Sequence, residues 1–380
     1  MIIILLSIFT EGGYSATLEE LRSLPYISWS GCKADARKSG VVKYDKEKSF
    51  DGYNLYTDCS EKAFLMDMGG RIVHTWRFPF PGYWEYASLL DSGQLIALAV
   101  NKYLARLNRD SGIIWVSEIN TSHDIEVLPD GTFLVPVRRP FLYNGRRVIF
   151  DAIFHISEKG RKIGEWWTNK DLGRLKKLHL GHALDRKEDD GGEERKDKRS
   201  YDYYHLNTIQ ALPDTPLGKK DKRFQKGNWL ICLRNVDLVC LLDKQTRDVV
   251  WNWGPGELDQ PHMPTMLDNG NILIFDNGTH REYSRIIEID PVSKEIVWEY
   301  KANPPEGFFS KWRGSNQRLA NGNTLICESE NGRVFEITAN GEIVWEFFNP
   351  EIKDSRRKLI YRMLRVPKEK VEGWLSCLSE

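Results

Sequence analysis

The sequence has no net charge, few cysteines and no long apolar run beyond its first residues. Its 54 basic and 54 acidic residues cancel, which argues against a protein that binds nucleic acid through bulk charge, although a local anion site stays open. The six cysteines do not have the spacing of a metal site. After the N-terminus, no segment is long and apolar enough to cross a membrane.

The few cysteines leave two interpretations open. Cys232 and Cys240 fall on two successive predicted strands, WLICLR and DLVCLLD, where they either face each other or are separate buried thiols. Cys32 and Cys59 could pair near the start of the chain. An oxidising compartment would favour at least one disulfide.

The N-terminus, MIIILLSIFTEGGYSATLEE, is apolar but too short to span a bilayer. Residues 1–16 resemble the hydrophobic core of a signal peptide or a truncated membrane anchor, although no basic residue precedes them and YSA is a poor cleavage site. We therefore expect an exported protein, periplasmic or secreted, with membrane anchoring as the alternative. Residues 17–49 are interpreted as an N-terminal extension and residues 367–380 as a C-terminal tail.

A phrase that ends in tryptophan recurs along the chain. Each copy follows a short apolar strand such as AFLMD or IIEID, after a polar turn such as DPVSKE. A second phrase consists of a strand, a tight turn and another strand; its Asp-Gly, Asn-Gly and Ser-Gly turns suit hairpins because glycine tolerates a positive φ. The tryptophan phrases are RIVHTW (71–76), GIIWV (112–116), KIGEWW (162–167), DVVWNW (248–253), EIVWEY (295–300) and EIVWEF (342–347).

Together the two phrases place four short strands in roughly 40–50 residues, which is typical of a β-propeller blade. A four-stranded sheet cannot bury both faces alone, so blades stack around an axis, and the tryptophans are expected to fill the wedges between them. Only five strand-turn-strand phrases are visible, and KLIYRMLRV (358–366) is expected to supply the sixth. The predicted fold is all-β: a six-bladed β-propeller over residues 50–366, its ring closed by N- and C-terminal strands in one blade.

Two charged segments interrupt the repeat. Residues 169–200 predict a short helix followed by a charged loop, and residues 214–227 predict an elongated hairpin loop. We assign both to the third blade. Such charge runs are usually solvated, and a role in binding a partner is the alternative.

Polar side chains are predicted to converge on the axis of the propeller. The start of each innermost strand lines the central channel, and we aligned these strands on the leucine that precedes the turn. A buried ring of polar groups is costly unless it is used or fully paired, so several histidines in register predict a site. The residues five positions before the leucine are Glu85, His123, Asn207, His262 and Gly314.

Other polar residues join or fall outside this register. His205 lies two positions before Asn207, on the same predicted strand face. Arg234 ends the next strand and can reach the same mouth, where a guanidinium beside imidazoles and an amide suits a tetrahedral oxyanion; a surface arginine is the alternative. The histidines without the register are His74, His155, His179, His182 and His280.

The phrases QPHMPTMLDNGNILIFDNG, HLNTIQALPD, LICLRN and HDIEVLPDG resemble the bacterial arylsulfotransferase family, the PAPS-independent aryl-sulfate sulfotransferases. The resemblance spans about residues 50–366 and is strongest in the phrase from the histidine to FDNG. It implies a six-bladed propeller that moves a sulfuryl group from a phenolic sulfate ester to a phenolic acceptor. It implies small-molecule partners and no cofactor or metal. The chain is short and matches a compact branch without the separate β-domain.

The resemblance also assigns roles to residues. His262 is the nucleophile that would carry a sulfohistidine, while His205, Asn207 and Arg234 would bind the sulfuryl oxygens. His123 would protonate the leaving phenolate or deprotonate the acceptor. Gly314 departs from the register, and Ser315 or Asn316 could replace its side chain. Glu85 and Arg362 complete the residues expected to contact substrate.

Two other functions compete with the transferase. A non-catalytic propeller that binds a ligand or another protein would keep the same framework. A hydrolase or a metal-dependent lyase would use the three histidines to hold a metal, although Arg234 nearby would repel the cation. The sequence indicates neither the physiological substrates nor an oligomeric state.

Overall fold

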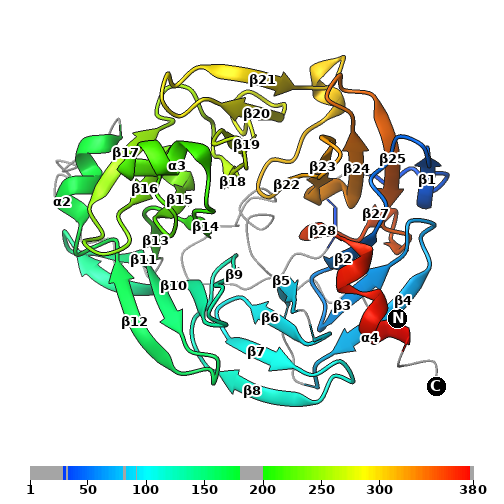
Figure 1. Ribbon diagram of the computed structural model, residues 1–380, viewed down its shortest axis with the longest axis horizontal. Helices are drawn as coiled ribbons and strands as arrows, with labels where there is room; N and C mark the ends of the chain where they lie inside the picture. Colours follow the sequence, from blue (N-terminus) through cyan, green and yellow to red (C-terminus); the bar gives the residue numbers. More distant parts are fainter. Residues whose placement is uncertain (1–28, 31–32, 80–82, 91, 180–199, 377–380) are drawn as a thin grey trace, which may run out of the picture.

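The chain folds into a ring of β-sheets around a central axis (Figure 1). The computed structural model describes residues 29–30, 33–79, 83–90, 92–179 and 200–376. The predicted export segment 1–16, Cys32 and His182 lie outside these residues. Export and the Cys32–Cys59 pairing therefore stay predictions.

Six antiparallel sheets form the blades, and the predicted six-bladed β-propeller is confirmed. We number the blades by their innermost strands. Blade 1 holds β5 (Trp84–Leu89), β6 (Leu95–Ala99), β7 (Tyr103–Leu107) and β8 (Ile113–Ser117); blade 2 holds β9 (Glu126–Val127), β10 (Phe133–Tyr143), β11 (Arg146–Ile156) and β12 (Lys162–Trp167); blade 3 holds β14 (Leu206–Ala211), β15 (Trp229–Leu233), β16 (Leu238–Leu242) and β17 (Val249–Trp253). Blade 4 holds β18 (His262–Met266), β19 (Ile272–Asp276), β20 (Arg285–Ile289) and β21 (Ile296–Tyr300); blade 5 holds β22 (Ser315–Arg318), β23 (Thr324–Glu328), β24 (Arg333–Ile337) and β25 (Ile343–Phe348).

Blade 6 combines strands that are distant in the sequence. It consists of β28 (Arg362–Val366), β2 (Tyr53–Thr57), β3 (Lys62–Met66) and β4 (Ile72–Arg77), and β28 pairs antiparallel with β2. The extension adds β1 (Gly40–Tyr44), which pairs with β25 as a fifth, outer strand of blade 5. The sequence analysis did not predict β1, because GVVKY lies outside the repeated phrases that identified the other strands.

The core lies between the blades. Six clusters of buried apolar residues each join one blade to the next: Leu134 of blade 2 and Ile231 of blade 3 share one cluster, and Leu55 of blade 6 and Ala97 of blade 1 share another. The stacking of sheets therefore buries the faces that a single blade would expose.

The recurring tryptophans have the predicted role between blades, and their indole N–H groups add a second one. The indole Nε1–H of Trp115 donates to the carbonyl of Glu158 in the next blade at 2.7 Å. Trp251, Trp298 and Trp345 make the same kind of bond, to Pro291, Ala339 and Met68 at 2.8, 2.9 and 3.0 Å. An aromatic with one polar group can fill an apolar wedge and still satisfy its N–H.

The cysteines of blade 3 are separate buried thiols. Cys232 lies opposite Val239, and Cys240 lies opposite Ile231, so their side chains project from opposite faces of the sheet. Burial raises the pKa of Cys240 to about 12. The alternative in which these two cysteines face each other is wrong, because their strands pair one residue out of that register.

The interruptions of the repeat carry short helices. The helix predicted after residue 169 is α2 (Leu172–Leu175), and residues 180–199 lie outside the described residues. The loop at 214–227 contains α3 (Pro216–Lys220), and the C-terminal tail contains α4 (Glu372–Leu375), where Trp374 is buried. Within the described part of the chain, no helix has the length and apolarity needed to cross a membrane.

Candidate active site

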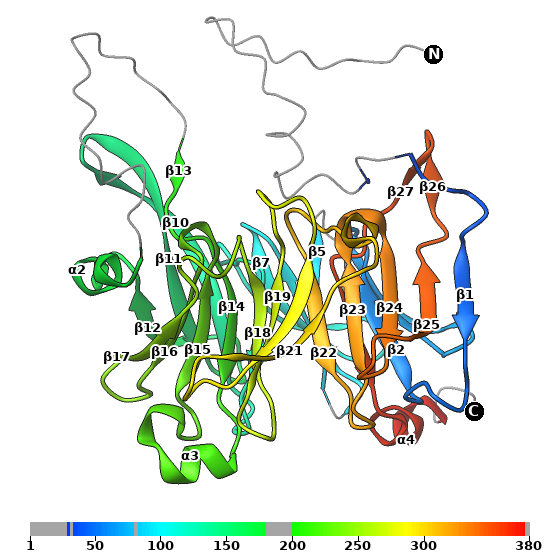
Figure 2. The same ribbon diagram turned by 90° about the horizontal axis from the view of Figure 1, so that it is seen from above.

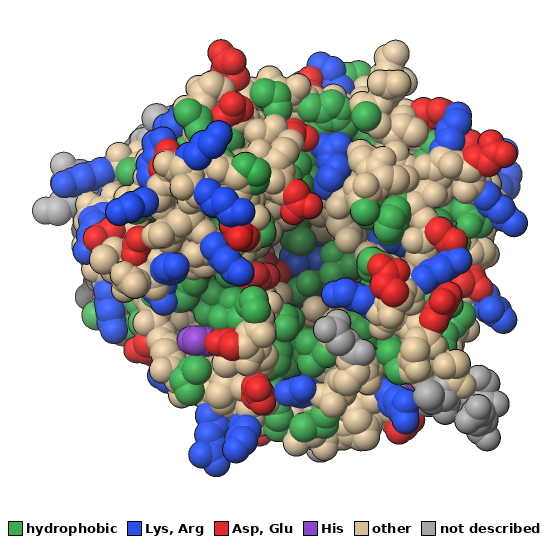
Figure 3. All heavy atoms as spheres, in the orientation of Figure 1, with side chains coloured by type: hydrophobic (Ala, Val, Ile, Leu, Met, Phe, Trp, Pro, Cys, Tyr) green, Lys and Arg blue, Asp and Glu red, His purple; other side chains and the backbone are tan. Residues whose placement is uncertain are grey.

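The innermost strands bring the predicted side chains to the middle of the ring. His262 begins β18, Asn207 is the second residue of β14, and Glu85 is the second residue of β5. His123 precedes β9. All four are buried. On the face that carries α3 and α4, the centre of the ring is hollowed, with charged side chains in its depth (Figure 3).

His262 is held in one tautomer. Its Nδ1 lies 2.7 Å from Oδ1 of Asn277, and the Asn277 amide donates to the carbonyls of Ser310 and Arg313 at 2.6 and 2.8 Å. The two carbonyls fix the NH2 end of the Asn277 amide, so its oxygen faces His262. An amide oxygen only accepts hydrogen bonds, and Nδ1 of His262 must therefore donate. The lone pair of the neutral imidazole is therefore on Nε2. Burial lowers the pKa of His262 well below its usual range, and the Arg234 charge lowers it further.

The backbone on both sides of His262 is tied to blade 3. The Asn207 amide donates to the carbonyl of Pro261 at 2.9 Å, and the backbone N–H of Met263 donates to the Thr208 hydroxyl at 3.0 Å. The Thr208 hydroxyl in turn donates to Oδ1 of Asn207 at 3.0 Å. In this structure, Asn207 thus positions His262; its predicted contact with substrate stays a prediction.

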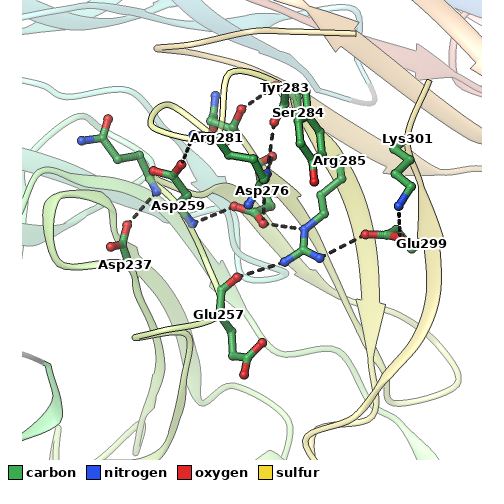
Figure 4. A network of polar contacts seen from close by, with 12 residues as sticks. Asp237, Glu257, Asp259, Asp276, Arg281, Tyr283, Ser284, Arg285, Glu299 and Lys301 are labelled. Atoms are coloured by element: carbon green, nitrogen blue, oxygen red, sulfur yellow. Dashed lines mark hydrogen bonds and ion pairs between the residues drawn. The ribbon is translucent and has the colours of Figure 1, made fainter. Parts of the chain in front are cut away.

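A network of charges supports the loops that flank His262 (Figure 4). Asp276, which is fully buried, accepts from the backbone N–H of Asp259 at 2.8 Å and from Arg285 at 2.7 Å, and pairs with Arg281 at 3.0 Å. Asp237 accepts from the backbone N–H of Gln260 at 2.6 Å. Asp276 precedes Asn277 directly, so the network fixes both the segment before His262 and the residue that orients it.

His123 and His205 form a stacked pair, each backed by a carboxylate. Their ring centroids are 4.7 Å apart. Nδ1 of His123 lies 2.7 Å from Glu85 and 2.8 Å from the Tyr361 hydroxyl, and Nδ1 of His205 lies 2.6 Å from Asp202. A carboxylate behind an imidazole fixes its tautomer and stabilises its protonated form.

The charges of this pair follow from its surroundings. Burial lowers the pKa of His205 to about 4, although Asp202 opposes the shift. Burial raises the pKa of Glu85, but the nearby His123 outweighs burial and lowers it overall. Glu85 is therefore ionised at neutral pH and acts only as an acceptor, so Nδ1 of His123 donates to it. Nε2 of His123 is buried without a hydrogen-bond partner.

Arg234 lies directly after β15 with its guanidinium buried. It donates to Asn235 at 2.9 Å and to Gln260 at 2.5 Å, and it lies over the Trp312 ring at 5.2 Å. Its Nε is buried without a partner. Burial lowers its pKa to about 10, so the group stays charged at neutral pH. A buried guanidinium with an unpartnered N–H costs stability, and this N–H can bind an anion.

The remaining predicted residues are also buried. The hydroxyl of Ser315 and Oδ1 of Asn316 lack hydrogen-bond partners, and the Asn316 amide donates to the Met263 carbonyl at 3.2 Å. Arg362 begins β28 and pairs with Asp124 at 2.6 Å. A side chain at Gly314 would meet the ring of Phe275 at 2.4 Å, which explains why the register has a glycine there.

Three of the other histidines lie away from this group, whereas the His179 ring contacts that of Tyr204, with centroids 6.0 Å apart. His74 and His155 are on the outer strands β4 and β11, where they bond to the Arg109 carbonyl and the Thr132 hydroxyl at 2.8 and 2.7 Å. His280 is exposed beside Asp259. Among the described residues, no cluster of three or more His, Cys, Asp or Glu is arranged to hold a metal ion.

Four residues of the site escaped the sequence analysis: Asn277, Asp202, Tyr361 and Trp312. Asn277 was within reach, since it lies in the FDNG phrase itself. Asp202 lies three residues before His205, but next to a charged segment that favoured a solvated loop. Tyr361 contacts His123 from a position 238 residues away, which no local pattern can reveal.

A comparison with protein families agrees with this geometry. The family model for arylsulfotransferase (ASST) matches residues 89–350. The chain belongs to the arylsulfotransferase family. The match contains His123, His205, Arg234 and His262, whereas Glu85 and Arg362 lie outside it. A comparison with curated proteins finds no match.

Solved structures that resemble this arylsulfotransferase-family protein are propellers. A protein of unknown function from Bacteroides caccae has 16% sequence identity and a TM-score of 0.53, covering 82% of this chain and 98% of that one. A catalytically inactive virginiamycin B lyase from Staphylococcus aureus has 12% identity and a TM-score of 0.45, covering 82% and 88%. At 16% identity, the similarity to the Bacteroides caccae protein shows the fold alone.

Replacing Asn277 by alanine tests the tautomer assignment. Without its acceptor, the proton of His262 is free to move to Nε2, and we expect kcat/KM for an aryl sulfate to fall by about 10–100-fold. The matched control is Asn323→Ala, another buried amide, which binds Lys48 and Glu336 in blade 5. Both variants lose buried hydrogen bonds, so thermal unfolding is measured for each. Normal activity of folded Asn277→Ala would show that the hydrogen bond from His262 to Asn277 does not decide which ring nitrogen of His262 carries the lone pair.

The lowered pKa of His262 predicts the acid side of the pH profile. A free histidine gains its proton near pH 6.5, whereas His262 stays neutral below that value. We expect kcat/KM for p-nitrophenyl sulfate to hold constant as the pH falls through 6.5, and to fall only at lower pH. The profile of kcat/KM reports the free enzyme. A fall of kcat/KM to half its value near pH 6.5 would contradict the lowered pKa of His262.

Proposed function

We propose that the protein transfers a sulfuryl group from a phenolic sulfate ester to a phenolic acceptor through a sulfohistidine at His262. The observation that carries the proposal is the state of the His262 side chain. It is a buried, neutral imidazole whose contact with Asn277 leaves the lone pair on Nε2. Such an imidazole is a competent nucleophile, and a covalent intermediate divides one difficult transfer into two easier steps.

In the first step, Nε2 of His262 attacks the sulfur and forms an N–S bond, while the bond from sulfur to the phenolic oxygen breaks. The phenolate leaves and takes a proton from His123. In the second step, the acceptor phenol gives its proton back to His123 as its oxygen attacks the sulfur, and the N–S bond breaks. The Glu85 carboxylate stabilises the protonated His123 in both steps.

The sulfuryl oxygens need donors in a dry site. Arg234 has an unpartnered Nε, and Ser315 has an unpartnered hydroxyl, both buried. An anion that enters the site also raises the pKa of His205, since a nearby negative charge favours the imidazolium, and Asp202 supports that proton from behind. Preorganised donors of this kind stabilise a loose, charged transition state without having to reorient.

Nitrophenolate release from p-nitrophenyl sulfate tests the proposal. We expect slow release from the protein alone and fast release when phenol is added, with phenyl sulfate as the second product. Release to water at the same rate with or without phenol would replace the transferase by a sulfatase. Absence of release, with sulfate unable to bind the folded protein, would favour the non-catalytic scaffold.

A further inference from the structure

The long hairpin of β10 and β11 projects beyond the blades of the ring. Each strand has 11 residues, against five or six in most others, and the pair rises beyond the blades in Figure 2. Asn144 and Gly145 form its turn with φ of 49° and 75°, the two positive values that a tight two-residue hairpin turn requires. The ladder is continuous from Phe133↔Ile156 to Tyr143↔Arg146.

The tip combines an exposed leucine with arginines. Leu142 is 82% exposed, more than any other large apolar side chain among the described residues. Arg147 lies directly opposite Leu142 in the ladder and is exposed. Arg139 lies on the other face, where its guanidinium is over the rings of Phe154 and Trp167 at 5.9 and 5.8 Å. Residues 138–147 contain four arginines and no acidic residue.

One face of the hairpin packs against the ring near its tip. Phe141 and Tyr143 are partly buried against the core cluster between blades 2 and 3. Leu142, on the other face of the ladder, has no such packing. A fixed apolar side chain beside basic ones is the chemistry that binds the surface of an anionic bilayer.

The N-terminal segment enters on the same face. Trp29 forms a β-bridge with Lys358, and the Ser30 N–H donates to the Arg357 carbonyl at 2.7 Å, beside the small hairpin of β26 (Ile352–Lys353) and β27 (Arg356–Arg357). In Figure 2 this small hairpin and the tip of β10–β11 rise on one side, opposite α3 and α4. The 28 residues before Trp29 begin with the apolar run MIIILLSIF. The basic, apolar tip lies on the face where the described chain begins at Trp29, and the sequence before Trp29 is apolar at its start; together these favour a membrane over an acidic protein as the occupant.

The candidate site lies near this end of the ring. Arg138 donates its backbone N–H to Asn120 at 3.1 Å, three residues before His123, and its side chain pairs with Asp202 at 3.5 Å. The tip lies about 13 Å further along β10, at about 3.3 Å per residue. Since β10 runs antiparallel to β9, it extends beyond the end at which β9 begins.

We infer that the β10–β11 hairpin docks the protein on an anionic lipid surface, with Leu142 entering the interface and Arg147 contacting the headgroups. The end of the propeller at which the inner strands begin then faces the bilayer.

Flotation of the full chain with lipid vesicles tests this inference. We expect binding to vesicles that contain phosphatidylglycerol, little binding to phosphatidylcholine alone, and a decrease with added salt. Arg147→Glu should weaken binding to phosphatidylglycerol vesicles by about tenfold, and Leu142→Glu should weaken it several-fold.

Matched controls place the same changes elsewhere. Lys220→Glu reverses one exposed charge on α3, on the opposite face, and Val297→Glu replaces an exposed apolar residue on β21. These variants should bind as the parent does. All variants keep residues 1–28, so a difference between them reports the hairpin. Failure of the parent to bind, unchanged binding of the hairpin variants, or equal loss in the controls would each overturn the inference.

Discussion

Replacing His262 by alanine is expected to lower sulfuryl transfer from p-nitrophenyl sulfate to phenol by about 10⁴-fold or more, because the proposed transfer passes through a covalent bond between sulfur and Nε2 of His262. His123 and His205 are stacked together, and each has its Nδ1 engaged with a carboxylate. His262 instead has its Nδ1 on the amide oxygen of Asn277, and its neutral imidazole keeps the lone pair on Nε2.

The intermediate gives a second readout for the same change. Parent protein mixed with donor and no acceptor should gain the mass of one sulfuryl group, and His262→Ala should not. The matched control is His280→Ala, since His280 is exposed and also bonds a neighbouring side chain, Asp259. Turnover and mass gain in folded His262→Ala at the parent's level would exclude His262 as the nucleophile, and the proposed mechanism with it.

Replacing Arg234 by glutamine is expected to lower kcat/KM for the donor by about 10²–10³-fold, the usual cost of removing one donor to a developing oxyanion. Arg234→Lys should recover only part of the loss, because a lysine cannot bond Gln260 and Asn235 and still present a donor to the ligand. Stability should not fall. The pKa of Arg234 is lowered by burial, so the folded protein holds this charge at a cost that glutamine removes.

The control for Arg234 lies in the same blade. Arg247 stacks on Trp229 with its guanidinium 3.5 Å from the ring centroid, as Arg234 stacks on Trp312, but it is outside the axial group. Arg247→Gln should leave kcat/KM unchanged. If both glutamine variants lose activity equally, or if Arg234→Gln lowers the melting temperature while activity per folded molecule is kept, Arg234 has a structural role only.

The sequence by itself determined the repeated four-stranded unit and the positions of the polar residues at the start of each inner strand. Turn glycines, strand alternation and the recurring tryptophans are local signals, since each depends on a few neighbouring residues and on how a blade must bury its faces. The register at the start of each inner strand follows from the same periodicity. It correctly placed Glu85, His123, Asn207 and His262 in the buried middle of the ring.

Only the tertiary structure decided which atoms of these residues can act. The free nitrogen of His262 depends on Asn277, whose amide is fixed by the carbonyls of Ser310 and Arg313, 33 and 36 residues later. His205 precedes β14 with a φ of +54°, so strand alternation could not give its direction. Its partner Asp202 is held by pairing of β13 (Tyr201–Asp202) with β11. The partners in hydrogen bonds between blades are not spaced at a regular interval along the sequence, because only the closure of the ring brings those positions together.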